Sequence, residues 1–472
     1  MEDKKRLSGL EKFAYGIGAV GKDMVYMLSA SFVLYYYQDI LGVDPIAMGI
    51  ILLVARVFDA FNDPIMGVLV AKTKTRFGKF RPWLLIGTIT NAVVLYLLFA
   101  APPALSGQGL VVYAAAAYII WGVTYTMMDI PYWSMVPAFT ESGKERENLS
   151  ALARSCAGVG SAIVQIAAIM SVKAIGTKIA GPGAASKMIE RTGFKYVAVI
   201  VAILFIVFTI ITCVCIKEKS SVDMEAASVK DMFKALIHND QAMTMVITIV
   251  LVNTAVYITN NLVIYFFKYD IASANWQGDY TLFTTFGGGI QILAMMLFFP
   301  MLRKAFDTMR IFYICIGSAV LGYIILLAMA LSGTKNVYLL FVPCLFIMGA
   351  VGVLNVIVTI FLANTVDYGE FVNNRRDESV IFSMQTFVVK LASGVAALIA
   401  ATSIKLFHIG AASTDEVVTE VVQASTGSLI GLRLTVTIIP MIVLLIAVMY
   451  FKKRYFLDDN KLAEINAKIR NN

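Results

Sequence analysis

Two carboxylates inside an apolar run constrain this chain more than any other feature. Asp59 and Asp63 lie within Ile50–Val70 (IILLVARVFDAFNDPIMGVLV), which is long enough to cross a bilayer as a helix. Four residues apart, they share one helix face, with Arg56 close to the same stripe. Acids in hydrocarbon are costly and two acids one turn apart repel each other, so this face needs a compensating cation. The pattern predicts a cation site. A structural Arg56–Asp59 pair that locks two helices together is the alternative.

The composition is that of a polytopic membrane protein. Of the 472 residues, 59% are hydrophobic and only 15% are charged. The net charge of +8 does not indicate a nucleic-acid partner, because the basic residues fall in short loops between apolar runs. The five cysteines lie within or at the ends of apolar runs and show neither metal-ligand spacing nor a disulfide framework. We expect no cleavable signal peptide, since the N-terminus is polar, and no ATP-driven pump, since no Gly-rich phosphate loop follows a strand.

Apolar runs of about 20 residues predict an all-α polytopic membrane protein with twelve transmembrane helices. The expected spans are 13–37, 46–71, 82–101, 110–137, 149–172, 194–216, 241–267, 280–300, 310–332, 337–364, 379–404 and 429–451. The longest polar connection between them, Lys217–Asp240, follows the sixth span. The expected domains are therefore an N-terminal six-helix half (1–216), a middle loop (217–240), a C-terminal six-helix half (241–451) and a tail (452–472).

Basic loops predict the orientation. Lys72–Arg81 carries five Lys or Arg residues and no acid, whereas the adjoining loops 38–45 and 102–109 carry no Lys or Arg. By the positive-inside rule, both termini and the middle loop are expected in the cytoplasm. The segment Lys173–Lys195 argues against this, because it places five basic residues on the expected outer side.

A carboxylate between aromatic residues marks the fourth span. Tyr125 and Trp133 lie four residues on either side of Asp129, and Thr126 lies three residues before it, so the helix presents them on one face. Such a face suits a sugar, which is polar at its edge and apolar on its C–H face. An aromatic interface belt with a structural acid is the alternative. Pro131 and Pro137 are expected to bend or end this helix.

Other intramembrane charges lie in spans one, five and eleven. Lys22 and Asp23 are adjacent near the middle of the first span, where neighbouring helical side chains point about 100° apart. We therefore expect them to contact different neighbours rather than each other. Arg154 and Lys390 complete the set. Neither of the two histidines lies deep in a span, so ion coupling is expected to use carboxylates.

These motifs resemble one family along essentially the whole chain. The matching segments are GKD at Asp23, VARVFDAFNDPIMG, RFGKFRPW, WGVTYTMMDIPYWS, DYGE and QTFVVK. They are similar to the glycoside–pentoside–hexuronide cation symporters of the major facilitator superfamily, and most closely to the melibiose-transporting members. The resemblance implies the major facilitator fold. We expect a multi-pass monomer in a bacterial inner membrane.

The resemblance also implies roles for individual residues. The residues expected to hold the sugar are Lys22, Asp23, Asp129, Trp133 and Arg154, and the helix-face argument adds Tyr125. The residues expected at the cation site for sodium, lithium or protons are Asp59, Asn62, Asp63 and Thr126, with Asp59 and Asp63 as the charged metal ligands. Arg56 and Lys390 are the expected coupling residues, and Lys390 is expected beside both sites. One position departs from the pattern: melibiose-transporting members carry Trp in span ten where this chain has Asn355.

The expected function is cation-coupled symport of a glycoside by alternating access, with an α-galactoside such as melibiose as substrate. The expected partners are the glycoside, a sodium ion and the lipid bilayer, with no further cofactor and no nucleic acid. The alternatives are symport of a xyloside or glucuronide, a lysolipid-type cargo, and a transporter-like receptor that binds sugar without moving it. No nucleophile–base pair appears in the sequence, so we do not expect an enzyme.

A cytoplasmic gate is also expected. The basic loop Lys72–Arg81 and the acidic segment Asp367–Glu378 carry complementary charge and should both face the cytoplasm. Arg376 and Glu145–Glu147 are further candidates for this gate.

Overall fold

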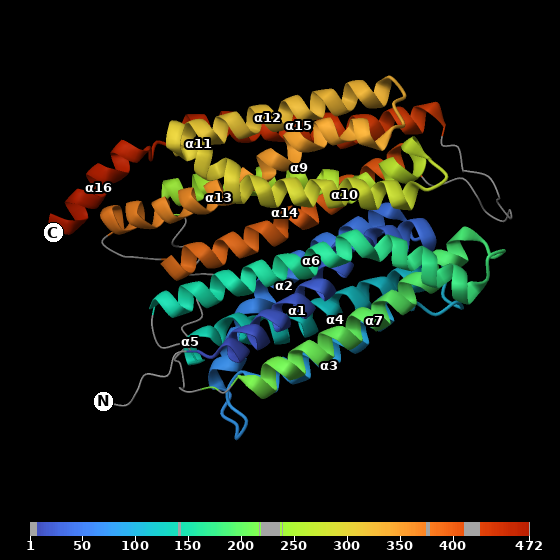
Figure 1. The fold of residues 1–472 in the computed structure, drawn as a ribbon, viewed down its shortest axis with the longest axis horizontal. Helices are drawn as coiled ribbons and strands as arrows, with labels where there is room; N and C mark the ends of the chain where they lie inside the picture. The colour runs from blue at the N-terminus through green and yellow to red at the C-terminus, as the bar shows by residue number, and fades with distance from the viewer. Residues whose placement is uncertain are drawn as a thin grey trace. The chain divides into compact units, whose positions relative to one another are not determined.

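A computed structural model describes residues 7–139, 143–216, 218, 237, 239–373, 378–409 and 425–471. Twelve helices in this part of the chain are long and apolar enough to cross a membrane, which confirms the expected fold class. The chain forms two compact units, Met1–Ala226 and Ala227–Asn472. In Figure 1 the first unit runs from blue to green and the second from yellow-green to red.

The first unit holds six of the twelve spans. Its elements are α1 (Gly9–Tyr35), the π-helical turn η1 (Tyr36–Ile40), α2 (Pro45–Lys72), α3 (Arg81–Leu98), α4 (Gly107–Ser134), the short α5 (Val136–Phe139), α6 (Gly143–Ala180) and α7 (Ser186–Cys215).

Local sequence signals set several of these helix ends. Ser8 and Glu11 form a capping box at the start of α1, and Asp44 caps α2 by accepting from the backbone N–H of Ala47. Pro131 lies inside α4, which ends three residues later at Ser134. This agrees with the expectation that prolines bend or end the fourth span.

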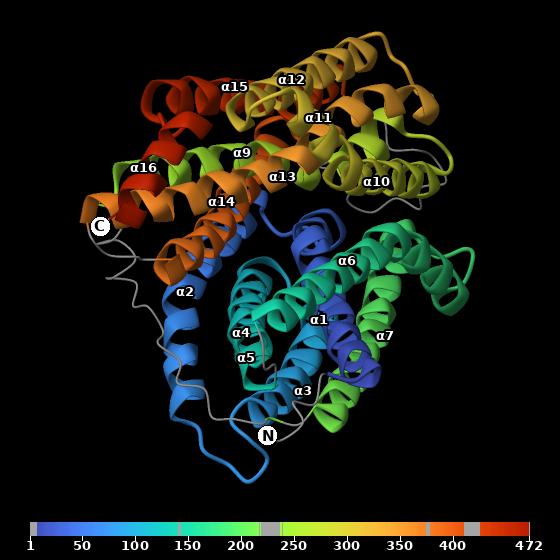
Figure 2. The same ribbon diagram turned by 60° about the vertical axis from the view of Figure 1, so that its left-hand side comes forward.

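Helix α1 packs against both α6 and α7, as Figure 2 shows. Glycines permit the close approach: a Cβ on Gly18 would lie 2.4 Å from Thr212 Oγ1, and one on Gly160 would lie 2.2 Å from the Val20 carbonyl oxygen. Helix α4 is tied to α1 by Tyr15 and Tyr132. Their rings stack with centroids 4.5 Å apart, and each hydroxyl donates to the other residue's carbonyl oxygen, at 2.7 and 2.5 Å. This pair holds α1 and α4 in register beside the charged residues of both helices.

The second unit holds the other six spans. Its elements are α9 (Asp240–Tyr265), η2 (Phe266–Ile271), α10 (Trp276–Leu293), η3 (Ala294–Phe298), α11 (Phe299–Ala305), α12 (Thr308–Leu331), α13 (Val337–Asn373), α14 (Glu378–Leu406), α15 (Thr426–Arg454) and α16 (Asp459–Asn471).

A buried ion pair fastens the ends of α9 and α15 in the second unit. Asp270 in η2 accepts from Arg433 Nε at 2.8 Å and from its terminal nitrogen at 2.6 Å, and the Asp270 side chain is only 5% exposed. The last helix, α16, lies against α13 and buries Leu462 and Ile465. Asp459 at its start accepts from Arg303 at 2.6 Å, which joins α16 to α11.

The expectation that residues 173–195 form an outer loop is wrong, because most of this segment is helical. Helix α6 continues to Ala180 and α7 begins at Ser186. The five basic residues therefore lie on helix ends, where Arg191 donates to the carbonyl oxygen of Ala101 at 2.8 Å and Lys195 lies over the rings of Tyr96 and Tyr196. Lys and Arg side chains at helix ends can pack their stems against neighbouring residues and keep the charge in polar surroundings.

Candidate functional site

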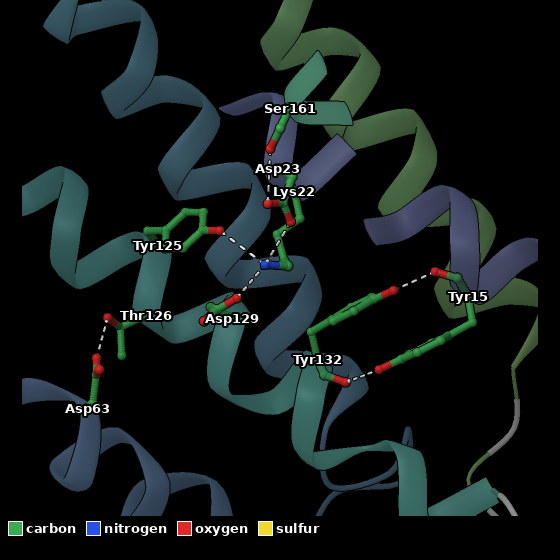
Figure 3. A network of polar contacts seen from close by, with 9 residues as sticks. All are labelled: Tyr15, Lys22, Asp23, Asp63, Tyr125, Thr126, Asp129, Tyr132 and Ser161. Atoms are coloured by element: carbon green, nitrogen blue, oxygen red, sulfur yellow. Dashed lines mark hydrogen bonds and ion pairs between the residues drawn. The ribbon is translucent and has the colours of Figure 1, made fainter. Parts of the chain in front are cut away.

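Lys22 is the centre of a charged cluster between α1 and α4 (Figure 3). Its ammonium nitrogen lies 2.8 Å from Asp129 Oδ1 and 3.1 Å from Asp23 Oδ2, and it donates to the Tyr125 hydroxyl at 3.2 Å. The Lys22 side chain is 6% exposed, whereas those of Asp23 and Asp129 are 19% and 23% exposed. One buried ammonium thus holds two carboxylates that remain accessible to a small molecule.

The Lys22–Asp23 ion pair corrects the expectation that these neighbours contact different partners. The helix does direct their Cβ atoms apart, but the flexible four-carbon stem of lysine lets its ammonium group return to the adjacent carboxylate. Asp129 on α4 is the second carboxylate within ion-pair distance, so Lys22 contacts both.

Trp133 and Arg154 adjoin the same cluster. The Lys22 ammonium lies 5.1 Å from the centroid of the Trp133 ring, and the Arg154 guanidinium lies 5.3 Å from it. Arg154 is exposed. The structure therefore brings together all six residues that the sequence predicts for the sugar: Lys22, Asp23, Tyr125, Asp129, Trp133 and Arg154.

Arg56 and Asp59 form a second, buried charge site on α2. Arg56 lies 3.1 Å from Asp59 Oδ2 and donates to the Tyr118 hydroxyl on α4 at 2.7 Å. Its guanidinium also lies 5.9 Å from the Tyr26 ring and 5.7 Å from the Tyr118 ring. Both side chains of the pair are 6% exposed. The Arg56–Asp59 ion pair therefore lies within α2, and the contact of Arg56 with α4 is its hydrogen bond to Tyr118.

Asp63 has a different environment from Asp59. Its Oδ1 accepts from the Thr126 hydroxyl of α4 at 2.9 Å. Asn62, the neighbour predicted to share the cation site, has a buried amide nitrogen with no hydrogen-bond partner among the described residues. Of the four residues predicted for the cation, Asp59, Asn62 and Asp63 lie on α2, and Thr126 of α4 bonds to Asp63.

Helix α4 contacts both charge sites through two consecutive residues. The Tyr125 hydroxyl is bonded to Lys22, and the Thr126 hydroxyl is bonded to Asp63 (Figure 3). Although the spacing places Thr126 with Asp129, its hydroxyl points to α2 and away from the Lys22 cluster.

Three contributors lie outside the predicted set. Tyr118 and Tyr26 surround the Arg56 guanidinium, and the Ser161 hydroxyl on α6 donates to Asp23 Oδ1 at 3.4 Å. The signal for Tyr118 was present in the sequence, because it lies seven residues, or two helical turns, before Tyr125. Ser161 has no such signal, since its contact joins helices 138 residues apart.

Two further candidates belong to the second unit. Lys390 is half-buried on α14, and Asn355 is exposed on α13, one turn before the exposed Thr359. The role of Lys390 beside both sites and that of Asn355 in specificity stay predictions.

Part of the expected gate lies outside the described residues. These parts are 374–377, with Arg376, and the side chains of Glu145 and Glu147. The structure describes the segment Lys72–Arg81, and Glu218 accepts hydrogen bonds from the backbone at its end. The Glu218 carboxylate accepts from the N–H groups of Lys79 at 2.7 Å and of Phe80 and Arg81 at 3.0 Å each. This caps the start of α3 with an acid, and the gate itself stays a prediction.

The sequence matches the model of one protein family over nearly its full length. That family is described as MFS/sugar transport protein, and the match covers residues 14–459. The chain belongs to the MFS/sugar transport protein family. The resemblance found in the motifs is confirmed at this level, and the chain is a multi-pass membrane protein of a transporter family.

Several relatives match along almost the whole chain. The symporter YjmB of Bacillus subtilis is 28% identical over 470 residues, covering 98% of this chain and 96% of the relative. The lactose permease of Lactobacillus delbrueckii subsp. bulgaricus is 28% identical over 473 residues, covering 98% and 72%. The raffinose carrier protein of Pediococcus pentosaceus is 25% identical over 478 residues, covering 97% and 71%. These relatives are transporters, which is consistent with the expectation of a non-enzyme.

Solved structures agree on the fold. A bacterial homologue of the human lysosomal transporter Spinster, in an inward-facing conformation, superposes with a TM-score of 0.67 at 10% identity, covering 94% of this chain and 95% of that one. The xylose transporter XylE of E. coli gives a TM-score of 0.57 at 12% identity, covering 95% and 98%. At such identities the comparison shows the major facilitator fold alone.

Proposed function

We propose that this protein is a sodium-coupled glycoside symporter, with an α-galactoside such as melibiose as substrate. Sugar symport is the activity that its family and relatives support. The observation that carries the finer proposal is the pair Tyr125 and Thr126, which joins an accessible charged cluster to a carboxylate one helix away.

The cluster around Lys22 supports sugar binding. Asp23 and Asp129 offer carboxylate oxygens that accept from vicinal sugar hydroxyls, and the exposed Arg154 offers donors. Trp133 supplies an apolar ring for the C–H face of a pyranose. Lys22 keeps the two acids close together, because without it they would repel each other. This set suits a polar, neutral ligand better than a lysolipid-type cargo.

The α2–α4 contact supports a cation site of oxygen ligands. Hard cations bind to oxygen ligands. Such ligands are available from the carboxylates of Asp59 and Asp63, the amide oxygen of Asn62 and the hydroxyl of Thr126. Among the described residues no group of three or more His, Cys, Asp or Glu side chains could hold a metal ion. Lithium and protons are the other candidate coupling ions.

Arg56 gives this site a built-in competitor. Its guanidinium already neutralises Asp59, so an arriving cation must share or displace it. Tyr118 and Tyr26 would retain the displaced guanidinium through a hydrogen bond and ring contacts. Cation binding would thereby move α2 against α4. Because Tyr125 of α4 bonds Lys22, this movement would also shift the charged cluster around Lys22.

Transport would proceed by alternating access of the two six-helix halves, in a monomer within a bacterial plasma membrane. Both termini and the middle loop would face the cytoplasm, since the basic loop Lys72–Arg81 favours that side. The proposed partners are thus the glycoside, sodium and lipid.

The test is counterflow in membrane vesicles loaded with unlabelled glycoside. A panel of labelled melibiose, a xyloside and a glucuronide is added with sodium, lithium or choline chloride. The proposal expects melibiose exchange that sodium stimulates. A xyloside or glucuronide preference would replace the substrate, and equal exchange in choline at constant pH would exclude sodium coupling. Sugar binding in detergent without any exchange in vesicles would point to the receptor alternative.

Asn355 is the proposed specificity residue of the second unit. It is exposed on α13, where an amide offers hydrogen bonds and an indole would offer a flat apolar surface. In the same panel Asn355→Trp is expected to raise the preference for α-galactosides. An unchanged glycoside profile would place Asn355 outside the substrate path.

A further inference from the structure

Neutral polar side chains continue from the charged cluster along the contact of α1 with α6. Ser161 donates to Asp23 at 3.4 Å, and Figure 3 shows the two side chains facing each other. One turn further on, Gln165 Nε2 donates to the Met27 sulfur at 3.2 Å. The Ser31 hydroxyl reaches the same sulfur from the next turn of α1, at 3.0 Å.

The hydrogen bonds of Ser31 and Gln165 are weak ones. A thioether is a poor acceptor compared with a hydroxyl or a carbonyl oxygen. Within the part of the chain that the structure describes, Met27 is the hydrogen-bond acceptor of both side chains. A ligand oxygen placed here would gain two better-matched donors, and the only bonds lost would be those to sulfur.

The geometry suits a ring adjacent to the one held by the charged cluster. Met27 follows Asp23 by four residues, a rise of about 6 Å along the helix, which is comparable to the separation of neighbouring rings in a disaccharide. Gln165 follows Ser161 by the same interval on α6. All of these side chains are partly exposed.

We propose that Ser31, Met27, Ser161 and Gln165 form a subsite for the second ring of an oligosaccharide. The inference rests on the proposed function, because the first ring is taken to lie at Asp23 and Asp129. The subsite is neutral, so it would recognise sugar hydroxyl groups by hydrogen bonding and would form no ion pair with a charged substituent. It would let the protein distinguish a disaccharide from a simple glycoside of the same first sugar.

The experiment compares two probes that share the first ring. Binding of melibiose and of methyl α-galactoside is measured by isothermal titration on the purified full-length protein in sodium. Gln165→Leu and Ser31→Ala each remove one donor, and each is expected to lower the melibiose affinity about five-fold, the effect of one neutral hydrogen bond. The methyl galactoside affinity is expected to stay within about two-fold of wild type. Ser171→Ala on α6, at a serine outside the cluster, is the matched control and should change neither.

Met27→Leu separates recognition from helix packing. It removes the sulfur that competes for both donors while keeping a similar volume, so melibiose affinity should rise. A cluster that merely joins α1 to α6 would instead lose affinity for both probes in all three variants, and that result would overturn the subsite. The subsite would also be excluded if the ratio of the melibiose affinity to the methyl α-galactoside affinity were the same in the wild type and in the variants. If the wild type binds neither probe, the proposed function fails, which this first measurement reveals separately.

Discussion

Arg56 and Asp59 form a buried ion pair one turn apart on α2, with 3.1 Å between the guanidinium nitrogen and the carboxylate oxygen. The pair lies next to Asp63, so α2 carries two acids and one internal cation within three turns. The sequence offers this pair as the alternative to a cation site, and the cation site at Asp59 and Asp63 stays a prediction. Asp59 bonds Arg56, whereas Asp63 bonds Thr126 of the neighbouring helix.

The first prediction concerns Arg56→Gln. Removing one partner of a buried ion pair typically costs about 3–5 kcal/mol of stability, because the remaining charge is uncompensated. A coupling cation at Asp59 and Asp63 would replace the lost positive charge, so sodium should raise the melting temperature of Arg56→Gln more than that of wild type. The measurement is thermal unfolding in detergent with sodium chloride or choline chloride.

Arg433→Gln is the matched control for that experiment. It breaks another buried Arg–Asp pair among the described residues, the one with Asp270 in the second unit, where no cation site is proposed. Its melting temperature should fall by the same amount in both salts. Equal sodium effects on Arg56→Gln and Arg433→Gln would remove Asp59 from the cation site.

The second prediction concerns Asp23→Asn and Asp129→Asn. Each carboxylate is held by Lys22, and each would accept hydrogen bonds from the sugar. Losing one charged partner from such a desolvated set should cost about 2–5 kcal/mol, so sugar binding should weaken at least tens-fold. Titration of melibiose into purified variants measures this, and the melting temperature confirms that they are folded. Near-normal affinity in both variants would place the sugar elsewhere.

The third prediction concerns pH and the last helix. Hydrogen bonds from Lys468 at 2.7 Å and Lys461 at 2.9 Å lower the pKa of Glu464 from 4.5 to about 2. Because the folded-state pKa is the lower one, this carboxylate stabilises α16 above about pH 4.5, and the contribution is lost as the pH falls through about 2. The Glu464 signal in carbon-13 NMR, assigned by its loss in Glu464→Gln, should therefore still be ionised at pH 4. Lys468→Ala should raise the pKa, whereas a wild-type midpoint near 4.5 would contradict the bonded geometry.

The sequence predicts the helices and the charge sites better than the contacts between them. Asp59 and Asp63 follow from apolar length and four-residue spacing, which are local properties of one helix. The partners Tyr118 and Thr126 lie more than sixty residues away on α4, and only tertiary packing brings them to α2. The family resemblance predicts Thr126 as a site residue, but it does not predict Tyr118, Tyr26 or Ser161.

Two local expectations fail for identifiable reasons. The divergence of adjacent helical side chains suggests that Lys22 and Asp23 stay apart, but it describes Cβ directions and not the reach of a lysine stem. The expected loop 173–195 is mostly helix, because a helix in a membrane protein can extend beyond the apolar run that marks its span. The π-helical turns at Tyr36–Ile40 and Phe266–Ile271 have no signal in the hydrophobic pattern at all.

Thermodynamic coupling between sugar and sodium shows whether the two binding sites are linked. Melibiose affinity is measured by titration at zero and saturating sodium, and sodium affinity is measured at zero and saturating melibiose, all on the wild-type protein. If Tyr125 and Thr126 link the two sites, each ligand raises the affinity of the other by one and the same factor, which for such couplings is about 5- to 150-fold. Thr126→Val should lower that factor. Melibiose binding that is identical with and without sodium would contradict the account.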